Sequence, residues 1–175
     1  MLIRQADDAD APAIHALHTA AFRPHNPDVS GELPEARLVD ELRGDGDLIP
    51  ALSLVAVRAG QIVGHSCASP ARLGDDPESA IGFGPLGVLP DRQRSGVGSA
   101  LVHATVGAAN ALGKSLVVLL GNPAYYSRFG FVLAGTLGIT PPVPDWAPHF
   151  QALPLAAYTQ RNRGEFRYSP AFDRL

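Results

Sequence analysis

The chain has 175 residues, of which 46% are hydrophobic, and its formal net charge is −3. This length and apolar content fit a globular domain with a sizeable core and exclude a disordered chain. No apolar run approaches the ~18 residues that a membrane-spanning helix needs, so we expect no membrane association. The negative net charge argues against general nucleic-acid binding, and we expect no nucleic-acid partner.

The N-terminal residues lack the basic start and the long apolar stretch of a secretory signal peptide. Cys67 is the single cysteine, so it cannot form an internal disulfide. This cysteine usage is typical of proteins in a reducing compartment, and we therefore expect a cytoplasmic protein.

Charged residues are unevenly distributed along the chain. No Asp or Glu occurs between Arg92 and Pro144, although this segment also contains Arg94, Lys114 and Arg128. That half of the chain suits an anionic ligand. The acidic tract Glu32–Asp47 is interpreted as a solvated helix face, which is also able to attract a cationic amine.

Hydrophobic periodicity predicts the order strand, helix, helix and hairpin in the first part of the chain. Asp7 and Asp10 form a capping pair at the start of the first helix. The expected elements are a strand at Leu2–Arg4, a helix that buries Ile14, Leu17 and Ala21, a helix at Glu35–Arg43, and a hairpin of Ser53–Arg58 and Gln61–Ser69 with Ala59-Gly60 as its turn. Residues Pro70–Ser79 are expected to form a polar loop.

The second part of the chain predicts strands separated by helices. Pro85 cannot donate to a strand ladder, so a bulge is expected within the strand that contains it. The expected elements are strands at Ile81–Val88, Ser115–Leu120, Phe131–Ala134 and Phe150–Leu153, a long helix at Ser99–Ala111 that ends at Gly113, and a short helix at Pro123–Phe129.

This order of elements predicts an α/β fold with a mixed sheet and helices on both of its faces. The strands before and after the long helix are expected to be parallel. We expect one domain over residues 1–175, with the Pro-rich C-terminal segment 140–175 as a part of it.

The most informative segment is the turn between the irregular strand and the long helix, Val88-Leu-Pro-Asp-Arg-Gln-Arg-Ser-Gly-Val-Gly-Ser99. A Gly-rich turn that opens a helix presents free backbone N–H groups and the positive end of the helix dipole at one place. The arginines in this turn add guanidinium groups. Together these groups predict a polyanion site, and a pyrophosphate fits it best.

Two segments resemble the GNAT acyltransferase superfamily. The stretch Gln93-Arg-Ser-Gly-Val-Gly98 fits that family's [Gln/Arg]-x-x-Gly-x-[Gly/Ala] signature, with Val88-x-Pro90 upstream of it. The stretch Asn122-Pro-Ala-Tyr-Tyr-Ser-Arg-Phe-Gly-Phe131 is similar to the family's Tyr-x-x-x-Gly-Phe segment, and is especially close to a bacterial subgroup of predicted N-acetyltransferases. The resemblance implies a central mixed, mostly antiparallel sheet with a splayed parallel strand pair, and an N-acetyltransferase that uses acetyl-CoA as cosubstrate.

The same resemblance implies roles for particular residues. Tyr126, four residues before Gly130, takes the position of the general acid that protonates the CoA thiolate. The amide of Val88 takes the position of the oxyanion donor. Tyr125 points about 100° away around the helix and is interpreted as structural. The residues implied in acetyl-CoA binding are Leu86, Gly87, Val88, Gln93, Arg94, Ser95, Gly96, Val97, Gly98, Ser99, Asn122, Tyr126 and Arg128.

Several alternatives remain open at this point. A non-catalytic acyl-CoA sensor on the same scaffold would share the loop without needing Tyr126. Gly82–Gly87 formally matches a dinucleotide fingerprint, which would indicate a nicotinamide-dependent enzyme, but no helix follows it and strand glycines are the better interpretation. Gly113-Lys-Ser115 resembles the end of a P-loop and is interpreted as a helix stop. The general base is undetermined: the candidates are a water chain, Glu32, Glu35, His25, His65 and Glu78.

Histidine and cysteine spacing favours no other chemistry. His65 and Cys67 share a strand face and are expected to be packed in the interior rather than to act as a nucleophilic pair. His15 and His18 lie one helical turn apart without a third ligand nearby in sequence, so no metal site is expected.

The resemblance implies a small-molecule or peptide amine as the acceptor, and small metabolites, antibiotics, peptide N-termini and protein lysines all remain open. The resemblance places acceptor specificity in variable loops, here Arg23–Glu35, Pro70–Ser79 and the Pro-rich tail. The resemblance alone implies a homodimer. Residues 158–175 match no pattern of the family.

Overall fold

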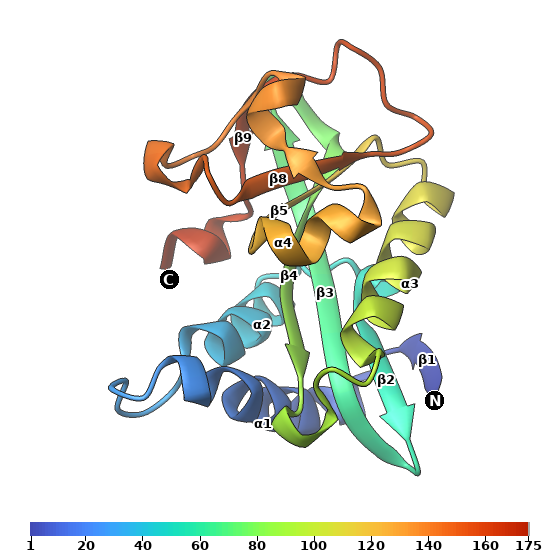
Figure 1. Ribbon diagram of the computed structural model, residues 1–175, viewed down its shortest axis with the longest axis vertical. Coiled ribbons are helices and arrows are strands. Elements are labelled where there is room, and N and C mark those ends of the chain that lie inside the picture. Colours follow the sequence, from blue (N-terminus) through green and yellow to red (C-terminus); the bar gives the residue numbers. More distant parts are fainter. Residues whose placement is uncertain (175) are drawn as a thin grey trace.

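The computed structural model describes residues 1–174 (Figure 1). Its helices and strands are joined by short 3₁₀ turns. In chain order they are β1 (Leu2–Gln5), α1 (Ala11–Phe22), α2 (Pro34–Gly44), β2 (Leu54–Arg58), β3 (Gln61–Leu73), β4 (Asp76–Val88), α3 (Val97–Ala111), β5 (Leu116–Leu120), α4 (Pro123–Tyr126), β6 (Val132–Leu133), β7 (Ile139–Thr140), β8 (Phe150–Pro154) and β9 (Gly164–Arg167).

The strands form a mixed sheet in the order β1-β2-β3-β4-β5-β8-β6, with β9 pairing with both β3 and β7. Neighbouring strands are antiparallel except for β4 with β5 and β7 with β9. The parallel contact of β4 and β5 is short, Ala80–Gly82 against Leu116–Val118. In Figure 1, α1 and α2 lie on one side of the long β3–β4 hairpin and α3 on the other. The predicted α/β fold with its parallel strand pair is therefore confirmed.

The two faces of the sheet can be assigned from two glycines. A Cβ on Gly87 in β4 would meet the ring of His18 in α1 at 2.8 Å. A Cβ on Gly64, in the neighbouring strand β3, would meet Val97 of α3 at 2.7 Å. Gly64 pairs with Val88, and successive residues of a strand point to opposite faces. Gly87 therefore faces α1, while Val88 and Gly64 face α3.

Local sequence features explain where the first helices begin and end. The predicted capping pair is present: the Asp7 carboxylate accepts from the Asp10 amide, and the Asp10 carboxylate accepts from the Asp7 amide. Asp10 also pairs with Arg4 at 2.6 Å, and this side-chain hydrogen bond holds the pKa of Asp10 at about 2. Pro34 occupies the first turn of α2, where a missing N–H costs nothing.

The prediction of a polar loop at Pro70–Ser79 is wrong, because β3 runs on to Leu73 and β4 begins at Asp76. Ala71 and Leu73 are buried while Pro70 and Arg72 are exposed, which is the alternation of a strand with one covered face. The extension is stabilised by β9, which pairs with Arg72 and Leu73 from a distant part of the chain. Pro70 and the polar residues around it hid this alternation in the sequence.

The tail contains more structure than its sequence predicts. The expected strand at Phe150–Leu153 is present as β8 and lies between β5 and β6. The short strands β7 and β9 and the final 3₁₀ turn at Pro170–Arg174 were not expected. Leu116, Val118, Phe150 and Phe166 pack together in one buried cluster, so the tail shares the core of the sheet. Within residues 1–174, no helix combines the length and the apolarity required to cross a membrane.

Replacing Gly82 tests how closely the tail packs on β4. A Cβ at Gly82 would lie 2.6 Å from Cδ1 of the Tyr168 ring, so we expect Gly82→Ala to lower the free energy of unfolding by about 1–3 kcal/mol. Gly107, in α3, has nothing within 4 Å of its Cβ position, and Gly107→Ala should instead stabilise the protein by up to about 1 kcal/mol. Urea unfolding of the two variants measures both changes, and equal effects would contradict the packing described here.

Candidate active site

A cleft of about 320 Å³ lies where the end of β4, the start of α3 and the short helix α4 meet. Nine residues line it: Leu86, Val88, Gln93, Arg94, Gly96, Gly98, Ser99, Tyr125 and Tyr126. Apart from Leu86 and Ser99, these positions come from the two sequence segments that carry the family resemblance. The fold thus brings together two stretches that are about thirty residues apart in the chain.

The cleft exists because β4 leaves β5 before β4 ends. The two strands pair only as far as Gly82 and Val118, whereas β4 remains paired with β3 up to Val88. Gly84 and Pro85 form the predicted bulge, since three steps along β4 oppose two along β3 at this point. The edge of β4 beyond Gly82 is therefore not covered by β5.

The backbone of Val88 faces this uncovered edge. The Leu89 amide donates a hydrogen bond to the Val63 carbonyl at 3.1 Å. In an antiparallel ladder, a bond in this position flanks a pair of opposite residues that do not bond to each other. Val88 and Gly64 are that pair, so the amide and the carbonyl of Val88 both point away from β3. The carbonyl accepts a hydrogen bond from Gln93 Nε2 at 3.3 Å. Within residues 1–174, the Val88 amide has no strand partner on this side.

The loop before α3 adopts a conformation that suits glycine. Gly96, the residue before the helix, has a φ of +86°, and Arg94 has a φ of +56°. The first bond of α3 runs from the Ala100 amide to the Gly96 carbonyl, so the amides of Val97, Gly98 and Ser99 have no acceptor within the helix. Because these amides sit at the positive end of a 15-residue helix, the loop is suited to an anion.

Tyr125 and Tyr126 form the opposite wall of the cleft, with their rings 4.9 Å apart in a T-shaped contact. The expectation that Tyr125 is merely structural is incomplete: it lines the cleft, and its hydroxyl lies 2.8 Å from the Cβ position of Gly98. The Tyr126 ring packs against Gly121 and Phe131. Burial raises the pKa of Tyr126 above its ordinary value of 10.0, so the phenol keeps its proton at neutral pH. Its hydroxyl has no hydrogen-bond partner among residues 1–174.

The other residues expected at the site lie beside the cleft rather than in its lining. Asn122 caps α4 by accepting from the Ala124 amide at 2.9 Å. Arg128 donates to the Tyr125 carbonyl and stacks over the Tyr125 ring at 4.9 Å. Gly87 faces α1, Val97 is buried and Ser95 is exposed. These five positions therefore do not line the cleft.

His65 and Cys67 are interior residues, as predicted. His65 Nδ1 lies 2.8 Å from His18 Nε2, and its other ring nitrogen lies 3.1 Å from the Ser53 hydroxyl. Burial lowers the pKa of His18 to about 3 and that of His65 well below 6.5, so both rings are neutral. Burial raises the pKa of the Cys67 thiol to about 12, which makes it a poor nucleophile at neutral pH.

None of the candidate general bases lines the cleft within the described chain. Glu78 is exposed near the start of β4, whereas the cleft is at the end of that strand. His15 has neighbours that its sequence spacing did not predict: Asp40 lies 2.7 Å from its Nδ1 and Glu32 lies 3.8 Å from its Nε2. The three side chains join α1 to α2 and to the loop between them.

Comparison with known proteins agrees with this geometry. The sequence profile of the acetyltransferase (GNAT) domain family matches residues 50–133. The chain is 38% identical to the uncharacterized N-acetyltransferase YhbS of Escherichia coli over 135 residues, which cover 77% of this chain and 75% of YhbS. It is 35% identical to the uncharacterized N-acetyltransferase YjhQ of the same organism over 141 residues, 79% of this chain and 74% of YjhQ.

Two solved structures are similar over nearly the whole chain. The crystal structure of YhbS in complex with CoA superposes with a TM-score of 0.87 at 34% identity, covering 99% of this chain and 92% of YhbS. A GNAT family acetyltransferase from Brucella melitensis in complex with acetyl-CoA superposes with a TM-score of 0.79 at 33% identity, covering 98% and 97%. The open edge of β4, the glycine loop before α3 and the two tyrosines of the cleft agree with these matches. The matches show that the chain belongs to the GNAT family of N-acetyltransferases.

Proposed function

We propose that this enzyme transfers an acetyl group from acetyl-CoA directly to a primary amine, with the cleft between β4, α3 and α4 as the acetyl-CoA site. The observation that carries the proposal is the outward amide of Val88 at the uncovered edge of β4, beside the free amides at the start of α3. The similar protein YhbS was solved in complex with CoA, and the Brucella protein in complex with acetyl-CoA. These complexes support acetyl-CoA as the ligand of the cleft in this chain.

The residues of the cleft fit this cosubstrate chemically. The amides of Val97–Ser99 and the guanidinium of Arg94 supply hydrogen bonds and positive charge for a pyrophosphate. Gly96 and Gly98 keep side chains out of this space, so that the backbone can approach the phosphates closely. The unpaired edge at Leu86–Val88 offers main-chain groups to the amide-like pantetheine arm. Gly87, Ser95, Asn122 and Arg128 have supporting roles, in keeping with their positions beside the cleft.

The reaction balances with groups that this chain provides. The neutral amine nitrogen attacks the thioester carbonyl carbon, and the Val88 amide donates to the oxygen on which negative charge develops. The new N–C bond forms as the C–S bond breaks, and the Tyr126 hydroxyl gives its proton to the departing thiolate. The amine proton leaves to water, and water restores the proton of Tyr126. The products are an N-acetyl amide and free CoA.

The first experiment is calorimetric titration of the protein with acetyl-CoA, with NAD as a control ligand. We expect binding of acetyl-CoA and none of NAD, followed by thiol release when a suitable amine is added. Binding without thiol release across a broad amine panel would indicate an acyl-CoA sensor instead. Absence of acetyl-CoA binding would overturn the assignment of the cleft.

Gly96→Asp should abolish acetyl-CoA binding, because it places bulk and a negative charge where the pyrophosphate is expected. Gly113→Asp is the matched control: Gly113 has a similar positive φ of +71° and nothing within 4 Å of its Cβ position, and it lies at the other end of α3. Calorimetric titration of both variants measures the effect. Unchanged affinity in Gly96→Asp, or equal losses in both variants, would contradict the role of the loop.

Tyr126→Phe should lower kcat by about 10²-fold, the usual scale of general acid catalysis, while the Kd for acetyl-CoA stays nearly unchanged. Tyr158→Phe, outside the cleft, is the control and should leave kcat unaffected. Steady-state thiol release gives kcat, and titration gives Kd. An equal loss of affinity and turnover in Tyr126→Phe would mean that this side chain only packs.

A further inference from the structure

The hydroxyl of Tyr125 reaches from α4 to the start of α3. It lies 2.8 Å from the place that a Cβ of Gly98 would occupy. Because an amide nitrogen lies about 2.5 Å from the Cβ position of its own residue, the phenol oxygen and the Gly98 amide nitrogen are at most about 5 Å apart. One phosphate group can accept hydrogen bonds from two donors at this separation.

Both donors are free to bind a ligand within the described chain. The Gly98 amide is one of the amides in the first turn of α3 that have no acceptor within the helix. The Tyr125 hydroxyl makes no hydrogen bond among residues 1–174, and Tyr125 and Gly98 both line the cleft. The side chain and the helix start therefore present two donors to the same space.

The ring of Tyr125 is held from several sides, which fixes the position of its hydroxyl. Tyr126 and Phe129 contact the ring in T-shaped arrangements, with centroid distances of 4.9 Å and 5.4 Å. The Arg128 guanidinium lies 4.9 Å from the ring centroid, and its Nε donates to the Tyr125 carbonyl at 2.9 Å. A donor that is already held in place loses little conformational entropy when it binds a ligand. The positive charge of Arg128 also favours an anion beside the hydroxyl.

The same hydroxyl restricts the residue at position 98. The family signature allows glycine or alanine there, but an alanine Cβ in this chain would lie 2.8 Å from the phenol oxygen, so that the hydroxyl would have to move. The next nearest atoms are Val88 Cγ2 at 3.6 Å and Tyr125 Cζ at 3.9 Å, which are ordinary contact distances. The hydroxyl, rather than the strand or the ring, is therefore what excludes a methyl group from this position.

We propose that the Tyr125 hydroxyl donates to the pyrophosphate of acetyl-CoA beside the Gly98 amide, and that this hydroxyl requires glycine at position 98. The proposal rests on the proposed function, since that function places the pyrophosphate at the start of α3. It gives the two adjacent tyrosines different roles: Tyr126 protonates the departing thiolate, whereas Tyr125 binds the other end of the cosubstrate.

Tyr125→Phe removes the donor and keeps the ring. It should raise the Kd of acetyl-CoA about tenfold, the lower end of the effect of a hydrogen bond to a charged group. S-acetylpantetheine has the thioester and the pantetheine arm but no pyrophosphate, and its Kd should change by less than about twofold. Calorimetric titration gives the first constant, and competition against acetyl-CoA gives the second.

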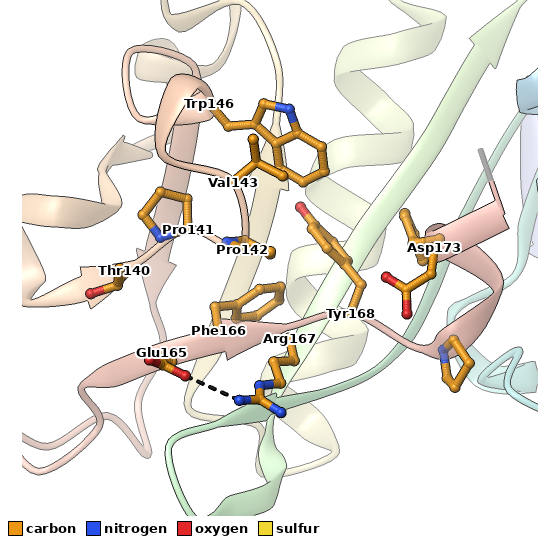
Figure 2. A pocket seen from close by; sticks show the side chains of 12 residues that line it. Thr140, Pro141, Pro142, Val143, Trp146, Glu165, Phe166, Arg167, Tyr168 and Asp173 are labelled. Atoms are coloured by element: carbon orange, nitrogen blue, oxygen red, sulfur yellow. Dashed lines mark hydrogen bonds and ion pairs between the residues drawn. The ribbon is translucent and has the colours of Figure 1, made fainter.

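Tyr168→Phe is the control, since it also removes one hydroxyl from the wall of a cavity. Tyr168 lines a second cavity, of about 530 Å³, whose walls come from the loop after β7, from β9 and from the 3₁₀ turn at Pro170–Arg174 (Figure 2). Figure 2 shows the Tyr168 hydroxyl directed toward Trp146. The two cavities share no lining residue, so Tyr168→Phe should leave the Kd of acetyl-CoA unchanged.

Gly98→Ala tests the second half of the proposal. In the wild-type protein the added methyl group displaces the Tyr125 hydroxyl, so we expect the Kd of acetyl-CoA to rise about tenfold. In Tyr125→Phe the same methyl group meets atoms at ordinary contact distances, so the double variant should bind acetyl-CoA as well as Tyr125→Phe alone. Independent effects would instead multiply to a loss of about a hundredfold.

The outcomes distinguish this proposal from the proposed function. Unchanged acetyl-CoA affinity in Tyr125→Phe, or equal losses for acetyl-CoA and S-acetylpantetheine, would overturn the role of the hydroxyl while the cleft remains the acetyl-CoA site. A multiplied loss in the double variant would overturn the link between Tyr125 and Gly98. Absence of acetyl-CoA binding by the wild-type protein would overturn the proposed function itself, and this proposal with it.

Discussion

The structure depends on one asymmetry of β4: the strand is paired on both edges at Ala80–Gly82 and on one edge only from Phe83 to Val88. A ladder that ends in this way leaves main-chain groups without partners, and such groups are costly unless water or a ligand satisfies them. The bulge at Gly84 and Pro85 stabilises the separation, since Pro85 has no N–H to donate toward β5. The cleft is thus a place where the sheet is left incomplete.

Small residues on both sides of β3 and β4 let the covering helices come close. Gly87 makes room for His18 of α1, and Gly64 makes room for Val97 at the start of α3. The second contact is important for the chemistry, because it fixes the first turn of α3 against the same strands that carry the Val88 amide. The free amides at the start of α3 and the outward amide of Val88 are therefore held by one packed layer rather than by a flexible loop.

The sequence correctly predicted the features that depend only on residues close together in the chain. The capping pair Asp7 and Asp10, the turn at Ala59-Gly60 and the glycine loop before α3 are local patterns with local causes, and all of them are present. The errors have long-range causes. Pro70–Ser79 became strand because β9, about ninety residues later in the chain, pairs with it. The place of Tyr125 in the cleft and the grouping of His15 with Glu32 and Asp40 also follow from the packing of distant elements.

The same distinction separates the two cavities. Every residue that lines the cleft lies between Leu86 and Tyr126, within the part of the chain that the family profile covers. Every residue that lines the second cavity lies between Thr140 and Asp173, outside that part. The lining of the cleft is thus encoded by two short segments, whereas the aromatic residues of the second cavity come from the 3₁₀ turn at Pro144–Trp146, from β9 and the residue after it, and from the terminal turn held by Arg174. The two cavities share no lining residue, so substitutions in the walls of the second cavity change the tail without replacing any side chain of the cleft.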